Sequence, residues 1–247
     1  MKFYRSILFV ALLGIAASLR GQVSQGVINY EVRMDMHRNL PEDRQELKAM
    51  IPQFRTDNFQ LFFTSTESLY KASEDQVHQP MGGGGGGGGG MRMMMRSPRT
   101  ETHVDRETRA RTVFQDVMGR NFLITDTLDI EPWKFGNEQM EIAGHMCMMA
   151  WFTDTVAKQE VTAWFAPQLP PFMGPDKYVT LPGTVLAVDI NNGERVWVAR
   201  KIEEREVKSS EVRKPSRGEK ITRDQFNKFV EEQRQRANPG GAAIRMF

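Results

Sequence analysis

The sequence predicts a mainly β protein built on an antiparallel, strongly curved sheet or incomplete barrel, with a short helix near the N-terminus and another near the C-terminus. Three observations support this fold class. Polar and apolar residues alternate in most segments, the connections between these segments are short and polar, and strands do not alternate with helices. Short connections favour antiparallel pairing, because parallel neighbours need long crossovers. We expect about seven to nine strands.

The N-terminal segment predicts an export signal. Basic residues precede an apolar run over residues 7–17, and small residues follow it. The run is too short for a permanent membrane anchor. We therefore expect residues 1–21 to be a signal peptide, cleaved after Ser18 or after Gly21, and the mature chain to lack a transmembrane segment.

The rest of the chain divides into a β domain over residues 22–215 and a C-terminal helix with a flexible tail over residues 216–247. The sequence has 33 basic and 31 acidic residues, so no overall charge favours nucleic acid as a partner. Cys147 is the only cysteine, so an intramolecular disulfide is impossible and we expect a small buried side chain there.

Alternation and turn residues place the individual strands. A bend at residues 65–67 is expected within the second strand, and the NNGE sequence at 191–194 is a strong hairpin signal. The predicted strands are residues 26–34, 58–71, 102–117, 121–128, 138–153, 159–167, 184–190 and 195–207.

Two segments have helical spacing. Residues 41–51 begin with proline and carry early acidic residues, which predicts a short helix. In the last segment, Thr222 and Gln225 have the spacing of a capping box, and Phe226, Phe229 and Val230 share one face.

Residues 75–99 contain nothing that predicts a regular element. Nine glycines, Gly82–Gly90, lie between methionines, and a run of this kind behaves as a random coil. We expect a disordered insertion in the β domain. Its simplest interpretation is a low-complexity loop without a specific role.

The segment VTAWFAPQLPPFMGPDKYVTLPGTVLAVDI, residues 161–190, resembles the GLPGLI family of exported bacterial proteins. The family motif is replaced here by TLPGTV, which keeps Leu181, Pro182 and Gly183. GVINYEV, LFFTSTESLY and WKFGNEQMEIAGHMCMMA also resemble the family, in the same order along the chain. The resemblance implies an exported, envelope-associated protein without an established activity. At the level of fold alone, the strand pattern also resembles the curved half-barrel of lipoprotein carriers.

The LPG sequence at residues 181–183 has its own interpretation. Proline restricts its own φ and glycine permits a positive φ, so a type II turn with Pro182 and Gly183 at its centre is expected. Such a turn would lead into the next strand, with contact to a ligand as the alternative.

No enzymatic motif is present in the sequence. It lacks G-x-S-x-G, H-E-x-x-H, a phosphate-binding loop and paired cysteines. We therefore expect a protein that is not an enzyme. The concave face of the sheet is the default place for a ligand, and the aromatic residues that could face it are Trp133, Trp151, Trp164 and Phe172.

A soft-metal site is the alternative. On a strand, His145, Cys147 and Met149 share one face, and these ligand types suit Cu(I). Successive residues on that face are about 6.5–7 Å apart, which is too far for one ion unless the strand bulges. A second set of possible ligands lies in the insertion: Met81, Met91, Met93, Met94, Met95 and His78.

Together with the export signal, the resemblance implies a periplasmic or outer-membrane-associated protein of a diderm bacterium that binds or supports another component. Its partner is expected to be an envelope protein or an apolar ligand rather than nucleic acid, and we expect a monomer without a cofactor. The alternative function is a methionine-rich Cu(I)-binding protein of the cell envelope.

Overall fold

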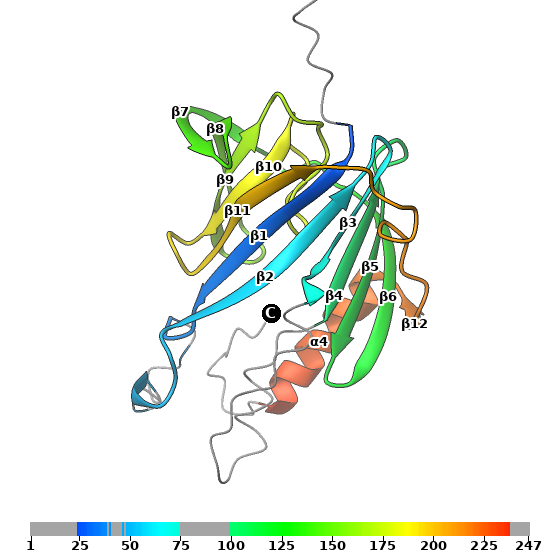
Figure 1. Ribbon diagram of the computed structural model, residues 1–247. Helices are drawn as coiled ribbons and strands as arrows, with labels where there is room; N and C mark the ends of the chain where they lie inside the picture. The colour runs from blue at the N-terminus through cyan, green and yellow to red at the C-terminus, as the bar shows by residue number, and fades with distance from the viewer. Residues whose placement is uncertain (1–23, 39, 41–45, 47, 75–98, 238–247) are drawn as a thin grey trace, which may run out of the picture.

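The computed structural model describes residues 24–38, 40, 46, 48–74 and 99–237. This part of the chain is mainly β, as predicted. It forms one open sheet of 12 strands, together with a helix, α4 (Arg223–Ala237), shown in Figure 1. The predicted signal peptide, most of the predicted insertion and the last ten residues lie outside the described residues.

The strand order across the sheet is β12-β6-β5-β4-β3-β2-β1-β11-β10-β9-β8-β7. Neighbouring strands are antiparallel, except that β12 runs parallel to β6. Strands that follow one another along the chain are mostly neighbours, as the short connections predict. The strands are β1 (Gly26–Asp35), β2 (Phe54–Phe63), β3 (Glu67–Ala72), β4 (Thr100–Asp105), β5 (Ala110–Val117), β6 (Arg120–Thr127), β7 (Lys134–Ile142), β8 (His145–Asp154), β9 (Gln159–Ala166), β10 (Thr184–Ile190), β11 (Arg195–Glu204) and β12 (Glu219–Ile221).

Alternation divides the side chains of the sheet between two faces. Directly opposed residues define each face across strands β1 to β5. One row consists of Ile28, Leu61, Tyr70, Thr102 and Val113. The row on the other face consists of Val27, Phe62, Leu69, His103 and Thr112.

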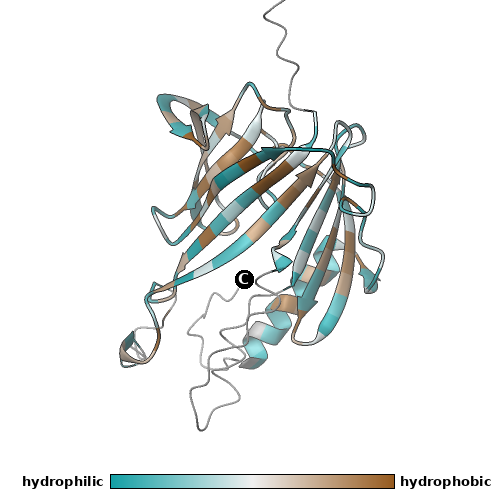
Figure 2. Ribbon diagram, in the orientation of Figure 1, coloured by the Kyte–Doolittle hydropathy of each residue, from teal (hydrophilic) through white to brown (hydrophobic). Residues whose placement is uncertain are grey.

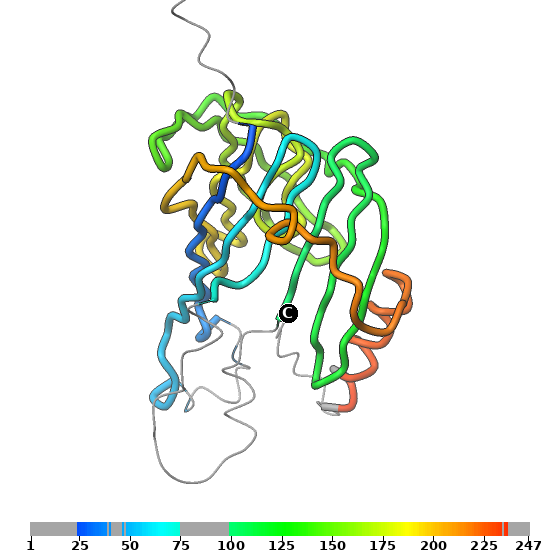
Figure 3. Tube along the Cα trace, turned by 45° about the vertical axis from the view of Figure 1, so that its right-hand side comes forward, coloured from blue at the N-terminus to red at the C-terminus, as the bar shows by residue number. Residues whose placement is uncertain are grey.

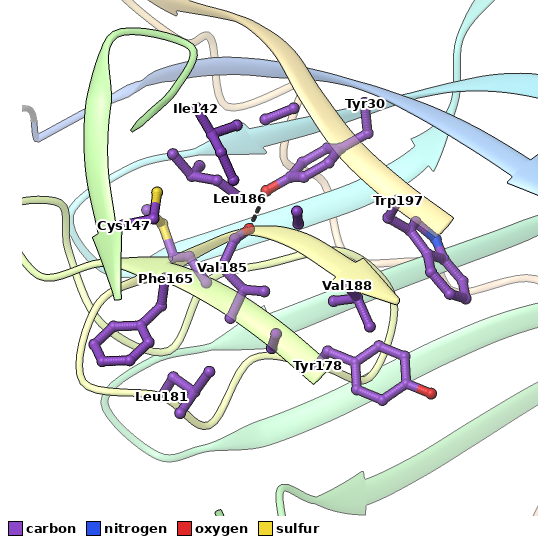
Figure 4. Close-up of a cluster of buried hydrophobic side chains, with 14 of the residues drawn as sticks. Tyr30, Ile142, Cys147, Phe165, Tyr178, Leu181, Val185, Leu186, Val188 and Trp197 are labelled. Atoms are coloured by element: carbon purple, nitrogen blue, oxygen red, sulfur yellow. Dashed lines mark hydrogen bonds between the residues drawn. The ribbon is translucent and has the colours of Figure 1, made fainter. Parts of the chain in front are cut away.

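The first face is covered in part by the connection between β9 and β10, residues 167–183, which we call the plug. Its buried apolar residues join the main hydrophobic core with side chains of β1, β2 and β8 to β11. The plug residues in this core are Leu169, Met173, Tyr178 and Leu181. Figure 4 shows Tyr178 and Leu181 beside Val185 and Val188 of β10. We call this face of the sheet the plug face.

Two hydrogen bonds fasten the plug to the start of β10, and a third joins the start of β10 to β1. Thr184 Oγ1 donates to the carbonyl of Pro170 (2.7 Å), and the Val185 amide donates to the carbonyl of Met173 (2.8 Å). The Tyr30 hydroxyl donates to the Val185 carbonyl (2.6 Å), as Figure 4 shows. The register of β10 against β9 shifts between Val185 and Ala187, and this irregularity frees groups of the strand for partners outside the ladder.

The second face is crossed by residues 205–218, which we call the strap, and is named the strap face. Val207 and Val212 of the strap pack on Val27 and Phe62. Further along, Arg217 lies 4.2 Å from the centre of the Phe114 ring. Figures 1 and 3 show the strap running from the end of β11 across the sheet towards β12.

The chain then returns to the plug face in α4. Phe226 packs edge to face on Phe122 of β6 (5.5 Å between ring centres), beside Val113 and Ile124. The capping box is confirmed, because Thr222 Oγ1 accepts the Gln225 amide (3.2 Å) and Gln225 Oε1 accepts the Thr222 amide (3.0 Å). The helix therefore begins where the sequence predicts.

The prediction of seven to nine strands was too low, largely because three long predicted strands are hairpins. Residues 58–71, where a bend was expected, belong to β2 and β3. Residues 102–117 form β4 and β5, since Asp105 Oδ1 accepts the amides of Glu107 (3.0 Å) and Thr108 (2.9 Å) and Arg109 has a φ of 58°. Residues 138–153 belong to β7 and β8, which turn at Ala143 and Gly144.

The expected N-terminal helix over residues 41–51 is not confirmed. Most of this range lies outside the described residues, and Glu46, Lys48 and Ala49 have 3₁₀-type geometry. In the part of the chain that the structure describes, no helix has the length and apolar character needed to cross a membrane.

The expected type II turn at LPG was wrong in its geometry. Gly183 does not have a positive φ. Instead, a Cβ at this position would lie 2.3 Å from the carbonyl oxygen of Ala166 and 2.9 Å from Cα of Pro167. Gly183 is therefore needed because the two ends of the plug approach each other backbone to backbone.

This close approach makes Gly183→Ala destabilising. We expect the free energy of unfolding to fall by about 1–3 kcal/mol, because the added methyl group forces the backbone apart. The exposed neighbour Pro182 provides the control, since Pro182→Ala should change stability by less than about 1 kcal/mol. Urea unfolding of both variants measures the difference, and equal effects would show that the contact has no special role.

Candidate ligand-binding face

A second part of the plug face lies outside the apolar core that the described plug residues complete. There, one row of opposed residues crosses three central strands: Arg195 of β11, Met34 of β1 and Arg55 of β2. All three side chains are half-buried. Figure 2 shows hydrophilic and hydrophobic residues interleaved along these strands. The row places two guanidinium groups on either side of a thioether.

Arg195 has no carboxylate partner among the described residues. One of its terminal nitrogens lies 3.8 Å from Met34 Sδ, and its guanidinium carbon lies 5.6 Å from the centre of the Trp197 ring. Burial lowers the pKa of the guanidinium below its usual value, although Asp176 and Tyr178 act to raise it. Arginine remains charged, so the cost of burial falls on a charge without a strong acceptor.

Arg55, in contrast, is paired. Its side chain contacts Asp57 Oδ2 through Nε (2.9 Å) and through a terminal nitrogen (2.8 Å). The two arginines are close enough for Arg55 to lower the pKa of Arg195 further. The positive charge that is not neutralised on this row therefore belongs to Arg195.

Aromatic side chains line the boundary between this row and the core. Trp197 packs edge to face on Tyr178 of the plug (5.7 Å between ring centres), and Figure 4 shows them side by side. Phe59 stacks on Tyr70 (5.0 Å), and Tyr30 meets Tyr70 edge to face (6.1 Å). Phe59 is half-buried, whereas the other four rings are buried.

Two hydroxyl groups on this face lack hydrogen-bond partners of ordinary geometry among the described residues. Tyr70 and Thr102 are directly opposed on β3 and β4, and each is 3% exposed. Among the described residues neither hydroxyl has a partner with ordinary hydrogen-bond geometry, although the Trp197 side chain lies near enough to the Tyr70 hydroxyl to lower its pKa. Burial raises the pKa of Tyr70 well above its usual value, and Asp176 raises it further. A buried hydroxyl without a partner costs about 1–3 kcal/mol, so this niche is one where an additional polar partner would be stabilising.

Asp176 is the acidic group nearest to this arrangement in the plug. Its backbone has a φ of 55°, in the left-handed region that is sparsely occupied by residues other than glycine and more readily by Asp and Asn. The carboxylate influences the pKa values of Tyr70, Tyr178 and Arg195, yet it forms no ion pair with a described residue. The plug therefore holds the Asp176 carboxylate near Arg195, but the two groups do not form an ion pair.

The aromatic residues expected on the concave face have separate positions. Trp133 and Trp164 pack against the main core, and Trp133 Nε1 donates to Thr180 Oγ1 (3.1 Å). Phe172 is a half-buried plug residue with a φ of 57°. Trp151 is 38% exposed, lies under the Lys134 ammonium group (4.5 Å) and does not contribute to the core.

The structure describes three of the proposed copper ligands. Cys147 is fully buried in the core, and its Sγ donates to the His145 carbonyl (3.4 Å). Burial raises the pKa of its thiol to about 11, which opposes formation of the thiolate that binds a metal. His145 Nδ1 lies 3.4 Å from Gln168 Nε2, and Met149 lies against Gly136. The other proposed ligands, His78, Met81, Met91, Met93, Met94 and Met95, lie outside the described residues.

No cluster of three or more His, Cys, Asp and Glu side chains suited to a metal occurs among the described residues. A hydroxyl, an imidazole and a carboxylate do lie near one another on the strap face. His103 Nε2 lies 2.9 Å from Glu67 Oε2, and Thr112 is opposite His103, but the Thr112 hydroxyl makes no hydrogen bond with a described residue. Thr112 and His103 are only 1% and 4% exposed, so a substrate could not reach them without movement of the chain.

Sequence analysis missed Arg195, Tyr70 and Thr102 as candidate site residues. A signal for Arg195 was available in the RVWVA sequence, because alternation places it on the same face as Trp197 and Ala199. An arginine on the apolar face of a strand is an exception to the usual pattern. The pairing of Tyr70 with Thr102 had no such signal, since the register of β3 and β4 spans the insertion.

One family matches part of the chain. Residues 153–187 match the family described as "Protein of unknown function (Porph_ging)". The matched segment runs from the end of β8 through β9 and the plug into β10. No curated protein matches the sequence.

The fold is similar to part of a larger solved protein. Two crystal structures of PNGF-II, in space groups P21 and C2, superpose with TM-scores of 0.57 and 0.56 at 11% and 12% sequence identity. Each comparison covers 85% of this chain, which spans about a third of the PNGF-II chain (34% and 33%). At this identity the likeness concerns the fold alone.

The stability of a Thr102 variant tests whether its hydroxyl lacks a hydrogen-bond partner. Thr102→Val replaces a buried hydroxyl that has no partner, so the free energy of unfolding should stay the same or rise. Thr184→Val is the matched control, because the buried Thr184 hydroxyl donates to Pro170 and its loss should cost about 1–3 kcal/mol. If urea unfolding showed that both variants lose similar stability, the Thr102 hydroxyl would have a partner in solution.

Proposed function

We propose that this chain is an exported, envelope-associated binding or accessory protein of the GLPGLI type, without catalytic activity, whose plug face receives an apolar ligand. In this proposal the open sheet serves as a curled half-barrel. The resemblance through the LPG segment supports the family assignment. The match over residues 153–187 concerns a family of unknown function and includes the same plug.

The observation that carries the proposal is that several polar groups on the plug face lack hydrogen-bond or ion-pair partners among the described residues. A side of the sheet that served only as a core would be closed by apolar contacts. Among the described residues, this one keeps a half-buried guanidinium without a carboxylate partner and two buried hydroxyls without partners of ordinary hydrogen-bond geometry, next to aromatic and thioether surfaces. Ligand sites in proteins commonly combine a mainly apolar lining with a few polar groups of this kind.

The methionine-rich copper alternative depends on residues 78–95, which lie outside the described residues. Among the residues that the structure describes, the burial and raised pKa of Cys147 argue against its use as a ligand. We therefore favour the ligand-binding function.

N-phenyl-1-naphthylamine, an uncharged probe whose fluorescence rises in apolar surroundings, tests the proposal. It should bind the purified processed chain, and Met34→Gln should weaken binding about fivefold to tenfold, because the row loses its apolar centre. Arg33→Gln is the matched control, since Arg33 is the exposed neighbour on the other face of β1. Its affinity should stay within about twofold.

Two results would contradict the proposal. If the probe does not bind, the plug face has no accessible apolar site. If both variants bind as the original chain does, the probe binds elsewhere. Fractionation of cells that express the full chain tests the export component separately, and recovery from the cytoplasmic fraction alone would refute it.

A further inference from the structure

The polar chemistry of the plug face narrows the class of ligand, on the basis of the proposed function. We infer that the ligand carries an anionic oxygen group, a carboxylate or a phosphate ester, which pairs with Arg195, while its apolar part lies along Met34 and Phe59. Arg195 is then the residue that determines specificity for charged over neutral apolar ligands.

The first argument is the mismatch between what Arg195 offers and what surrounds it. A guanidinium has five N–H donors in a planar fork that suits two oxygens of an anion. Its guanidinium contacts two groups of the described residues through its N–H donors or its charge: the Met34 thioether at 3.8 Å and the centre of the Trp197 ring at 5.6 Å. A thioether is a weak acceptor, so the fork is left for an oxygen anion.

The carboxylates near Arg195 either bind other groups or do not pair with it. Asp57 is bound by Arg55 at 2.8 Å. Glu194, the sequence neighbour of Arg195, accepts a hydrogen bond from Asn191 Nδ2 at 2.6 Å. Asp176 affects the pKa of Arg195 but does not pair with it, and its backbone is fixed in the left-handed region within the plug. The described residues thus supply no close counterion for Arg195.

The surroundings of Arg195 suit an apolar body rather than a polar one. Met34 lies between the two arginines, Val32 is opposed to Trp197, and Phe59 is a half-buried ring next to Tyr30 on the same face. The row from Arg195 to Arg55 spans about 10 Å, given the usual separation of neighbouring strands. An alkyl chain with one charged end fits this combination, because its tail contacts the apolar residues while its head meets the guanidinium.

Asp176 allows a second prediction, in which a substitution strengthens the binding of an anionic ligand. Its negative charge lowers the potential at the place where the ligand's anion would bind. Asp176→Asn removes this charge and keeps the side-chain shape, and asparagine also tolerates a positive φ. The variant should therefore bind an anionic ligand more tightly and a neutral one unchanged.

Calorimetric titration with three ten-carbon probes tests the inference. Decanoate, decyl phosphate and decan-1-ol share one tail and differ in the head group. On the processed chain, at least one anionic probe should bind about tenfold more tightly than the alcohol. The stronger of the two anions indicates whether the natural group is a carboxylate or a phosphate ester.

Substitutions test whether Arg195 causes the preference for the anionic probes. Arg195→Gln should bring the affinity for the anionic probe down to that for the alcohol, whereas Arg200→Gln should leave both affinities unchanged. Arg200 is the matched control, because it lies on the same strand, is exposed and pairs with Glu31 at 2.6 Å. Asp176→Asn should tighten the anionic probe about twofold to tenfold.

The outcomes separate the inference from the proposed function. If all three probes bind with equal affinity and Arg195→Gln changes none of them, the inference is overturned and apolar binding stands. If no probe binds, the proposed function fails and the inference fails with it. If Arg195→Gln does not fold, unchanged affinity of the anionic probe for Asp176→Asn still overturns the inference.

Discussion

The backbone contact between the two ends of the plug is the constraint on which the rest of the structure depends. Gly183 lies against the Ala166 carbonyl, so the chain leaves β9 and enters β10 at almost the same place. The long connection must then fold back on the sheet instead of extending away from it. The hydrogen bonds of Thr184, Val185 and Tyr30 fix the position in which it folds.

A plug held in this way separates one face of the sheet into two parts. The plug residues complete an apolar core that includes side chains of β1, β2 and β8 to β11, whereas the row of Arg195, Met34 and Arg55 lies outside this core and remains half-buried. The plug also brings Asp176 and Tyr178 to the boundary between these parts. The same segment that stabilises the fold therefore shapes the charge of the candidate site.

The strap and α4 have a complementary role on the other half of the sheet. The strap covers the apolar residues of the strap face, and the parallel pairing of β12 with β6 leads the chain to the edge of the sheet. α4 then packs on Phe122 and Ile124 on the plug face. Both ends of this face thus receive a cover from the chain itself, and we propose its middle as the place where a ligand binds.

Local patterns in the sequence were sufficient for most of the strands and for α4. The alternation at Ile28 to Met34, the NNGE turn and the Thr222–Gln225 box are all short-range signals, and each is confirmed. The hairpin at Asp105 was missed because continued alternation through Arg106 and Thr108 concealed an aspartate-capped turn. The role of Gly183 could not be derived, because it depends on a contact with Ala166 that only the folded chain creates.

The candidate site was less accessible to prediction than the fold. Tyr70, Thr102 and Arg195 are ordinary strand residues in the sequence, and their meaning depends on which groups are absent around them. Whether these side chains have partners depends on the pairing register of the strands and on the path of the plug. Aromatic residues such as Trp151 were better candidates by type, but strand twist and register placed that one at the surface.

The most direct measurement is the ¹H–¹⁵N spectrum of the four tryptophan indoles during addition of decanoate. Trp197 lies beside Arg195 on the plug face, whereas Trp151 is exposed near the β7 edge of the sheet, and a Trp197→Phe variant assigns the first signal. We predict that the Trp197 signal shifts with saturable dependence on decanoate while the Trp151 signal stays in place. A shift of Trp151 with Trp197 unmoved would contradict binding at Arg195 on the plug face.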